Sequence, residues 1–365
     1  MTSPNASIPA PGQAPAQPPT GPTPLLEVRD LKTAFDLAEG RVVAVDGATF
    51  SVHQGETLGI VGESGCGKSI SARSILRITG ATDSNISGEI LYHRKTVKGE
   101  PGHTETIDLL RLDAAGKQIR SIRGAEIAMI FQEPMTAFSP VHTVGNQIME
   151  GVWLHERISS GDARRRAIDM LRLVEMPNAE RRIDEYPHQL SGGMRQRAMI
   201  AMALICQPRI LLADEPTTAL DVTTQAQILA LLRRLKEELG MSVVMITHDL
   251  GVVAETAQRV AVMYLGRVVE TADVRDLFRD PKHPYTQAML NSIPRMGRRA
   301  RERLKPVEGM VPSPYNRPRG CPFHTRCPHV MPGLCDVHEP KPTKLENGRD
   351  VSCFLYGKPE GIGTA

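Results

Sequence analysis

The amino-acid sequence predicts an α/β fold, and two observations carry that prediction. Short apolar runs with the composition of buried strands occur at residues 57–61, 127–131, 209–215 and 242–246, and stretches of helical period separate them. The overall composition, 41% hydrophobic and 23% charged, is that of a globular protein with a packed core. A chain of 365 residues is long enough for about two domains.

The first of these strands leads into a phosphate-binding pattern. Residues 62–69 read GESGCGKS, which satisfies G-x-x-x-x-G-K-[ST], and a helix is predicted directly after them at residues 69–78. Glycines let the backbone wrap closely around an anion, and the helix N-terminus favours negative charge. Lys68 suits the β- and γ-phosphates, and the Ser69 hydroxyl suits Mg²⁺. We therefore predict a nucleoside triphosphate site formed by Gly62, Glu63, Ser64, Gly65, Cys66, Gly67, Lys68, Ser69 and the adjoining Ile70.

The segments before this loop suggest a tail and a small sheet. Residues 1–24 contain eight prolines and no charged side chain, which predicts a disordered, proline-rich tail. Alternating runs at residues 25–28, 42–45 and 48–52 predict a small antiparallel sheet. Phe35 lies in the predicted connection between the first two runs, where its ring could stack on a base or simply pack.

Polar residues follow the later strands at the positions where ligands bind in α/β proteins. The stretch at residues 83–125 looks strand-rich, and the next strand ends at Gln132, which could ligate Mg²⁺ or orient water. Another strand ends in Asp214 and Glu215, of which the first could hold the metal and the second could polarise water for attack. His248 follows the last of the buried strands and is a candidate for contacting the γ-phosphate.

A helical pattern interrupts the strands between residues 144 and 183. It leads into Ser191, Gly192 and Gly193, which open a long helix predicted to run through Cys206. A helix that begins with two glycines presents free backbone N–H groups, so it is a second candidate for binding phosphate.

Together these motifs resemble those of the nucleotide-binding subunits of ATP-binding cassette (ABC) transporters. The resemblance covers residues 25 to about 290 and includes the sequence LSGGMRQR at residues 190–197, a signature that ordinary phosphate-loop NTPases lack. It implies an ABC-type P-loop NTPase fold, with a RecA-like core, an antiparallel β subdomain and a helical subdomain at about residues 135–190.

The resemblance also implies a head-to-tail dimer that hydrolyses ATP. ATP would lie between residues 62–69 of one subunit and Ser191, Gly192 and Gly193 of the other. The implied catalytic residues are Glu215 as general base, with His248 and Gln132 contacting the γ-phosphate, Mg²⁺ and the attacking water. The implied Mg²⁺ ligands are Ser69, Gln132 and Asp214.

Three further stretches resemble the ATPase subunits of dipeptide and oligopeptide importers: residues 135–141 (MTAFSPV), 283–287 (HPYTQ) and 320–328 (GCPFHTRCP). Members of this group also import nickel, glutathione or oligosaccharides. The implied partners are a second, related ABC ATPase subunit, two transmembrane permease subunits and an extracytoplasmic peptide-binding protein. The implied location is peripheral, on the cytoplasmic face of the plasma (inner) membrane.

The alternative is a cassette protein that acts on ribosomes or DNA. We expect no nucleic-acid partner, because the net charge is only +3 and one cassette without a basic arm is present. The longest apolar run, residues 198–206, is too short to span a bilayer, so a protein that serves a membrane would here sit on its surface or dock to another subunit.

Residues 291–365 form a predicted C-terminal extension with an unusual concentration of cysteine. Cys321, Cys327, Cys335 and Cys353 lie in a proline-rich stretch with few core-forming residues, which suggests that a metal staples it. Cys₄ ligation suits a [4Fe–4S] cluster, which the resemblance also implies, whereas zinc or free thiols that merely pack are the alternatives. The other two cysteines fall in the nucleotide-binding part and need no partner.

Overall fold

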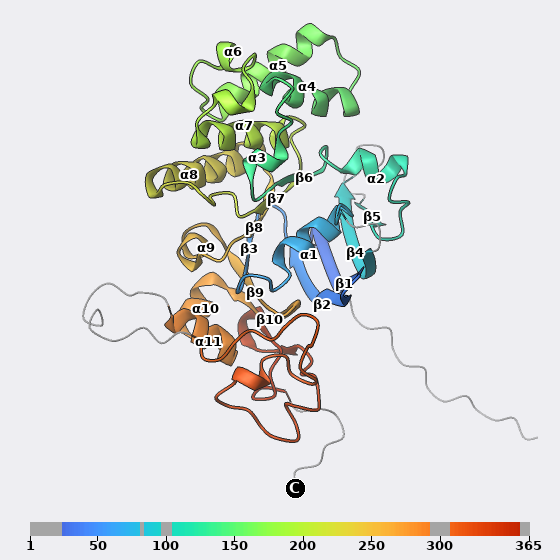
Figure 1. Cartoon of the computed structure of the whole chain (residues 1–365), viewed down its shortest axis with the longest axis vertical. Coiled ribbons are helices and arrows are strands. Elements are labelled where there is room, and N and C mark those ends of the chain that lie inside the picture. The colour runs from blue at the N-terminus through green and yellow to red at the C-terminus, as the bar shows by residue number, and fades with distance from the viewer. Residues whose placement is uncertain (1–23, 81–83, 96–103, 293–306, 358–365) are drawn as a thin grey trace, which may run out of the picture.

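The computed structural model describes residues 24–80, 84–95, 104–292 and 307–357, which form a smaller and a larger sheet with helices around them (Figure 1). The predicted proline-rich tail therefore lies outside the described residues, apart from its last residue, Pro24. Of the predicted C-terminal extension, residues 307–357 are described, and we use the term C-terminal extension for these residues from here on.

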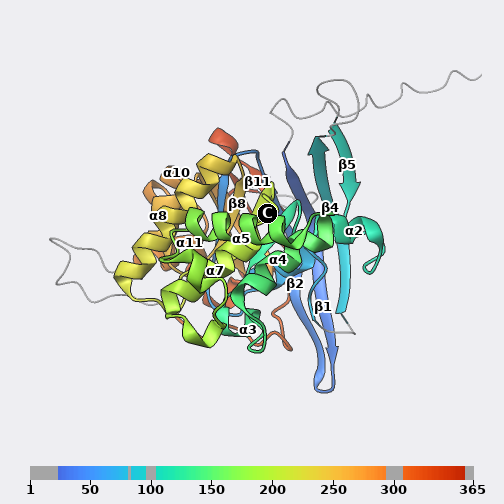
Figure 2. The same cartoon turned by 90° about the horizontal axis from the view of Figure 1, so that it is seen from above.

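The smaller sheet is antiparallel, as predicted, and stands along one side of the molecule (Figure 2). The two runs predicted at residues 42–45 and 48–52 belong to one strand, because a bulge at Gly47, with φ +86°, lets the pairing continue past it. A helix, α2 (Lys117–Ile122), lies in the stretch that looked strand-rich. In spatial order the strands are β2 (Gly40–Val52), β1 (Leu26–Leu37), β4 (Ser84–Lys95) and β5 (Thr104–Asp108).

The placement of Phe35 in a connection was wrong. Phe35 lies inside β1, where it pairs with Val42 of β2. Pairing continues as far as Leu37 and Gly40, so only residues 38–39 connect the strands.

The larger sheet has a parallel part, which reaches one edge of the sheet, and antiparallel strands at the other side. All four predicted buried strands belong to the parallel part, within two residues of the predicted bounds, and one of them, β6, is the edge strand. Because parallel strands point the same way, the residues that follow them meet at one edge of the sheet. In spatial order the strands are β11 (Thr343–Lys344), β12 (Asp350–Val351), β10 (Arg267–Asp273), β9 (Arg259–Tyr264), β3 (Thr57–Val61), β8 (Ser242–Ile246), β7 (Ile210–Asp214) and β6 (Ile127–Ile130).

The larger sheet is covered on both faces, which explains why its central strands are apolar throughout. Alternate residues of β7 point to opposite faces: Ile210 and Leu212 belong to the core shared with helix α1 (Lys68–Ile75) and the smaller sheet. Leu211 and Ala213 belong to a second core that includes helices α7 (Gly192–Leu204) and α8 (Val222–Leu239). Helix α1 thus lies between the sheets, with its N-terminus at the phosphate loop.

The predicted helical insertion is present at the end of the molecule farthest from the C-terminal extension (Figure 1). Side-chain caps begin two of its helices, since Thr143 and Ser159 accept N–H groups from the first turns. Buried apolar residues join these helices to α7 in one core. The helices are α3 (Pro134–Ala137), α4 (Val144–His155), α5 (Ser160–Leu173) and α6 (Ala179–Arg182).

The C-terminal extension packs on the opposite end, against helices α10 (Val274–Arg279) and α11 (Pro284–Asn291) and the edge of the larger sheet, in a core to which helix α9 (Leu250–Thr256) also contributes. Its strand β12 pairs with β10. Its largest buried side chain, Phe323, lies 5.2 Å from the Tyr264 ring and 5.4 Å from the Tyr285 ring. These aromatic contacts give the extension a hydrophobic core that it shares with the rest of the chain.

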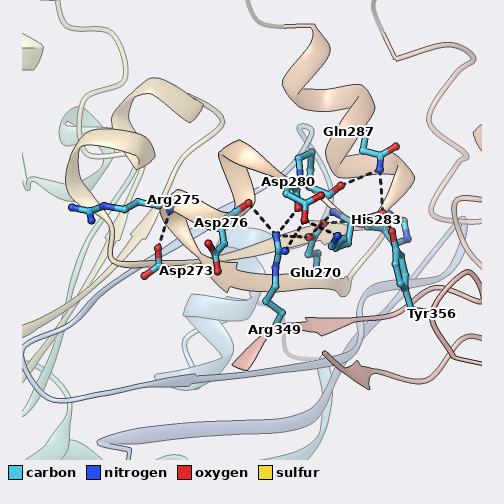
Figure 3. Close-up of polar contacts among 11 residues, drawn as sticks. Glu270, Asp273, Arg275, Asp276, Asp280, His283, Gln287, Arg349 and Tyr356 are labelled. Carbon is cyan, nitrogen blue, oxygen red and sulfur yellow. Dashed lines mark hydrogen bonds and ion pairs between the residues drawn. The ribbon is translucent and has the colours of Figure 1, made fainter. Parts of the chain in front are cut away.

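Arg349 provides the polar anchor of the extension (Figure 3). Its guanidinium, only 7% exposed, donates to the carbonyl oxygens of Asp276 and Asp280 at 3.0 and 2.6 Å. The buried Glu270 carboxylate lies 3.9 Å away and accepts the backbone N–H groups of Lys282 and His283, both at 2.9 Å. This network fixes the extension to the loop between α10 and α11.

We expect Arg349→Met to destabilise the protein by about 1–3 kcal/mol, because it leaves buried carbonyl groups without their charged donor. The melting temperature should fall, and limited proteolysis should cut the extension faster. Arg319→Met, at an exposed position of the same extension, is the control and should change neither. Equal behaviour of the two variants would contradict the anchoring role.

Candidate active site

The phosphate loop, residues 62–69, is held in a shape that requires glycine. Gly67 has φ +96°, and a Cβ atom there would lie 2.3 Å from the Ala44 carbonyl oxygen. The Lys68 ammonium group is buried and donates to the carbonyl oxygens of Gly62 and Glu63 at 2.8 and 3.0 Å. The loop therefore keeps a positive charge folded against its own backbone at the N-terminus of α1, as an anion site requires.

Ser69 and Asp214 form the part of the site that suits a divalent cation. Ser69 Oγ donates to Asp214 Oδ1 at 2.8 Å, joining the phosphate loop to the end of β7. Asp214 is fully buried, its Oδ2 atom has no hydrogen-bond partner among the described residues, and burial raises the pKa of its carboxyl. A buried carboxylate oxygen without a partner is costly unless a cation satisfies it, so this donor set fits Mg²⁺.

Glu215 is held by three donors from different parts of the chain. It accepts from Gln132 Nε2 at 3.0 Å, from Thr218 Oγ1 at 2.8 Å and from His248 Nδ1 at 3.1 Å. Burial by itself would raise the pKa of its carboxyl, but the hydrogen bonds from His248 and Thr218 outweigh burial and hold the pKa below its ordinary value. Glu215 is therefore ionised at neutral pH and able to accept a proton.

The structure thus brings together two of the predicted sets of residues. Ser69 meets Asp214, and Gln132 and His248 meet on Glu215. Thr218 was missed by the sequence analysis, although its place three residues after the acid, in the turn that precedes α8, was a usable signal.

The signature residues lie elsewhere, on a different surface. Ser191 is the N-cap of α7, and its hydroxyl accepts the Met194 N–H at 3.4 Å. Ser191 and Gly192 are exposed, and α7 stands in the helical part of the molecule, apart from α1 (Figure 1). This helix N-terminus is therefore free to receive a ligand from outside.

Two further predicted residues have side chains engaged in the fold. The Phe35 side chain is half-buried in β1, and the Ile70 side chain packs against the core between the sheets. Ser64 and Gly65, in the middle of the phosphate loop, are exposed and therefore accessible to a ligand.

Comparison with known proteins identifies the family. The family model of the ABC transporter matches residues 45–218, and that of the oligopeptide/dipeptide transporter C-terminal region matches residues 269–335. The dipeptide transport ATP-binding protein DppD of Bacillus subtilis is 46% identical over 332 residues, which cover 91% of this chain and 94% of that protein. The chain belongs to the peptide ABC transporter ATP-binding proteins.

Other similarities agree with this assignment. The DppD protein of Haemophilus influenzae is 47% identical over 337 residues, covering 92% of this chain and 97% of that protein. The dimeric structure of MJ0796, a bacterial ABC transporter cassette, has a TM-score of 0.57 and 29% identity, covering 68% of this chain and 99% of that one. This ABC protein is therefore an ATPase whose hydrolysis is coupled to transport, and its α/β fold is the predicted one.

Four of the six cysteines of this ABC protein come close together in the C-terminal extension. Each of the four interacts electrostatically with the others, and burial raises the pKa values of three thiols, to about 12 at Cys321, to about 11 at Cys353 and upward at Cys327. Cys335 is also buried. Even so, no group of three or more His, Cys, Asp or Glu side chains in the described ranges is placed to hold a metal ion, so the predicted cluster remains a prediction.

We expect Glu215→Gln to slow ATP hydrolysis by about 10²–10⁴-fold, because the amide keeps the shape of the carboxylate but cannot accept a proton. ATP binding should be retained. Single-turnover hydrolysis in the assembled transporter is the measurement, since a partner subunit with its own site would mask part of the loss at steady state. Wild-type single-turnover rates in the variant would remove Glu215 from the role of base.

Proposed function

We propose that this chain is the ATP-hydrolysing subunit of an importer for dipeptides or oligopeptides. The observation that carries the proposal is that one chain combines the Asp214–Glu215 site with a C-terminal region of the oligopeptide/dipeptide transporter type. Two relatives that align over more than nine-tenths of the chain are named dipeptide transport ATP-binding proteins.

The proposed mechanism assigns one task to each group. Lys68 and the loop N–H groups bind the β- and γ-phosphates, and Phe35 stacks on the adenine base. Mg²⁺, held by Ser69, Asp214 and Gln132, would neutralise charge on the phosphate oxygens. Glu215 accepts a proton from the water that attacks the γ-phosphorus.

The hydrogen bonds that Glu215 accepts fix the orientation of its carboxylate. Gln132 and Thr218 both bond to Oε2, and His248 bonds to Oε1, so the carboxylate cannot turn freely. His248 is 67% exposed, which leaves its ring able to reach the γ-phosphate once ATP is bound. We assign to His248 and Gln132 the contacts with the γ-phosphate and the attacking water.

The exposed N-terminus of α7 supports an ATP site that is shared between two subunits. Ser191, Gly192 and Gly193 would contact the ATP bound to a second subunit, so that closing the dimer completes each site. We propose a related rather than identical ABC ATPase as that second subunit.

The remaining partners follow from the proposed import of peptides. Two permease subunits would form the pathway, and an extracytoplasmic peptide-binding protein would deliver the peptide. Within the described residues, no helix is both long and apolar enough to cross a membrane. We propose a peripheral position for this chain, on the cytoplasmic face of the plasma membrane.

We expect purified transporter in proteoliposomes to accumulate a labelled tripeptide, and Lys68→Ala in this chain to abolish uptake, because the phosphates lose their charged partner. Lys32→Ala, on the exposed face of β1, is the control and should transport normally. Uptake of Ni²⁺, glutathione or an oligosaccharide instead of peptide would replace the proposed substrate. Co-purification with ribosomal RNA rather than permeases would replace the proposed function.

We also propose that Cys321, Cys327, Cys335 and Cys353 hold a [4Fe–4S] cluster with a structural role. The donor set supports this proposal: the sulfurs of Cys327 and Cys335 accept the backbone N–H groups of His329 and Met331, both at 3.4 Å. Such bonds stabilise thiolate ligands of a metal. The cluster would staple the extension and supply no redox step to ATP hydrolysis.

We expect anaerobically purified protein to be brown, with broad absorbance near about 400 nm from the thiolate-ligated cluster. Cys327→Ser should bleach it and loosen the extension, whereas Cys206→Ser, outside the extension, should leave the colour unchanged. Colourless protein with stoichiometric zinc would support zinc instead. Metal-free protein with a protease-resistant extension would show that the thiols merely pack.

A further inference from the structure

Glu63, the second residue of the phosphate loop, is tied to the C-terminal part of the chain by its side chain. Its two carboxylate oxygens accept from Arg326 Nη1 at 2.7 Å and Nη2 at 3.1 Å. Paired bonds between a guanidinium and a carboxylate fix geometry as well as charge. The sequence separation is 263 residues, so the contact joins the extension directly to the nucleotide site.

The backbone of Glu63 is held as well, on both sides of the residue. Its N–H donates to the hydroxyl of Tyr285 at 2.9 Å, and its carbonyl oxygen accepts from Lys68 Nζ at 3.0 Å. One residue thus connects the phosphate-binding lysine, through a backbone carbonyl, to two side chains that lie beyond the phosphate loop.

Arg326 is itself rigidly placed, which a positioning role requires. Its side chain is 3% exposed, and the guanidinium also donates to the carbonyl oxygens of Val307 and Glu308, at 3.2 and 2.9 Å, and to the Tyr264 hydroxyl at 3.3 Å. It lies over the Tyr264 and Phe323 rings, 5.8 and 5.9 Å from their centres. A buried cation with this many partners has little freedom to move.

We infer that Arg326 is a positioning residue for ATP binding: through Glu63 it fixes the base of the phosphate loop, so that the C-terminal extension sets the affinity of the nucleotide site. The reason is mechanical. A loop rich in glycine has little stiffness of its own, and external contacts must hold its N–H groups in one arrangement. The inference requires ATP binding at residues 62–69 and is independent of the transported substrate.

The structure offers a matched control for this inference. Arg349, like Arg326, is a buried arginine of the extension that bonds to backbone carbonyl groups, but its partners lie in β10, in α10 and directly after α10, and not in the phosphate loop (Figure 3). Both Arg326→Met and Arg349→Met should loosen the extension. Only Arg326→Met should also weaken ATP binding.

The experiment measures the KM for ATP, kcat and the melting temperature of the assembled transporter. Arg326→Met should raise KM about 5- to 10-fold, the loss of part of one charge-assisted contact, while kcat changes less than about twofold. Arg326→Lys, which keeps the charge but not the paired bonds, should recover part of the affinity. Arg349→Met should lower the melting temperature and leave KM within about twofold of wild type.

Glu63→Gln tests the same contact from the other side and stays informative if Arg326→Met fails to fold. Glu63→Gln should raise the KM for ATP by a similar factor. The double variant of Glu63→Gln and Arg326→Met should have a KM no higher than that of the more affected single variant, because both substitutions remove the same interaction. An unchanged KM in Glu63→Gln would overturn the inference. Additive effects of the two substitutions would also overturn it, because they would show that Glu63 and Arg326 act independently. An equal rise of KM in Arg349→Met would overturn it as well, because it would indicate general loosening of the extension.

Discussion

The structure depends on a phosphate loop that packs so closely against neighbouring backbone that two of its positions accept only glycine. At Gly62 and at Gly67 a Cβ atom would lie 2.2 Å from the Met263 carbonyl oxygen and 2.3 Å from that of Ala44. The loop therefore fits between β9 and β2 only without side chains at these two points. Contacts with the sheets on either side of α1 hold the loop in one shape, because its glycines give it little stiffness of its own. Lys68 donates to the carbonyl oxygens of Gly62 and Glu63, which ties the beginning of the loop to the start of α1.

Two adjacent carboxyl groups at the end of β7 show how environment divides chemical roles. Asp214 is fully buried and its carboxylate accepts from Ser69, while its second oxygen has no partner among the residues that the structure describes, which suits it to a cation. Glu215 receives three donors and stays ionised, which suits it to accept a proton. Glu215 adopts a left-handed backbone conformation, with φ +46°, directly after the last residue of β7. Neighbouring residues with similar chemistry thus face different surroundings, and their pKa values move apart.

Much of this site was predictable because its parts are local. A strand, a loop and a helix that are adjacent in the chain predicted the phosphate site. The positions of Gln132, Glu215 and His248 after buried strands predicted that they lie near it. Errors arose where tertiary structure overrides local pattern. Phe35 seemed to lie in a connection, yet pairing with Val42 carries β1 past it. The role of Arg326 could not be predicted, because no feature of its neighbours in the sequence indicates a partner in the phosphate loop.

That long-range contact bears on what a C-terminal extension can contribute to an ATPase. The short elements of the extension bury little, and it is joined to the rest of the chain through Phe323, Arg349 and Arg326. The first two contacts fix it in place, whereas the third reaches the nucleotide site. Because Arg326 lies between Cys321 and Cys327, anything that rearranges these cysteines also moves the guanidinium that holds Glu63. A phosphate loop that is held only by contacts within its own domain does not respond to such changes. A phosphate loop that is also held by an added segment keeps its shape only as long as that segment stays folded.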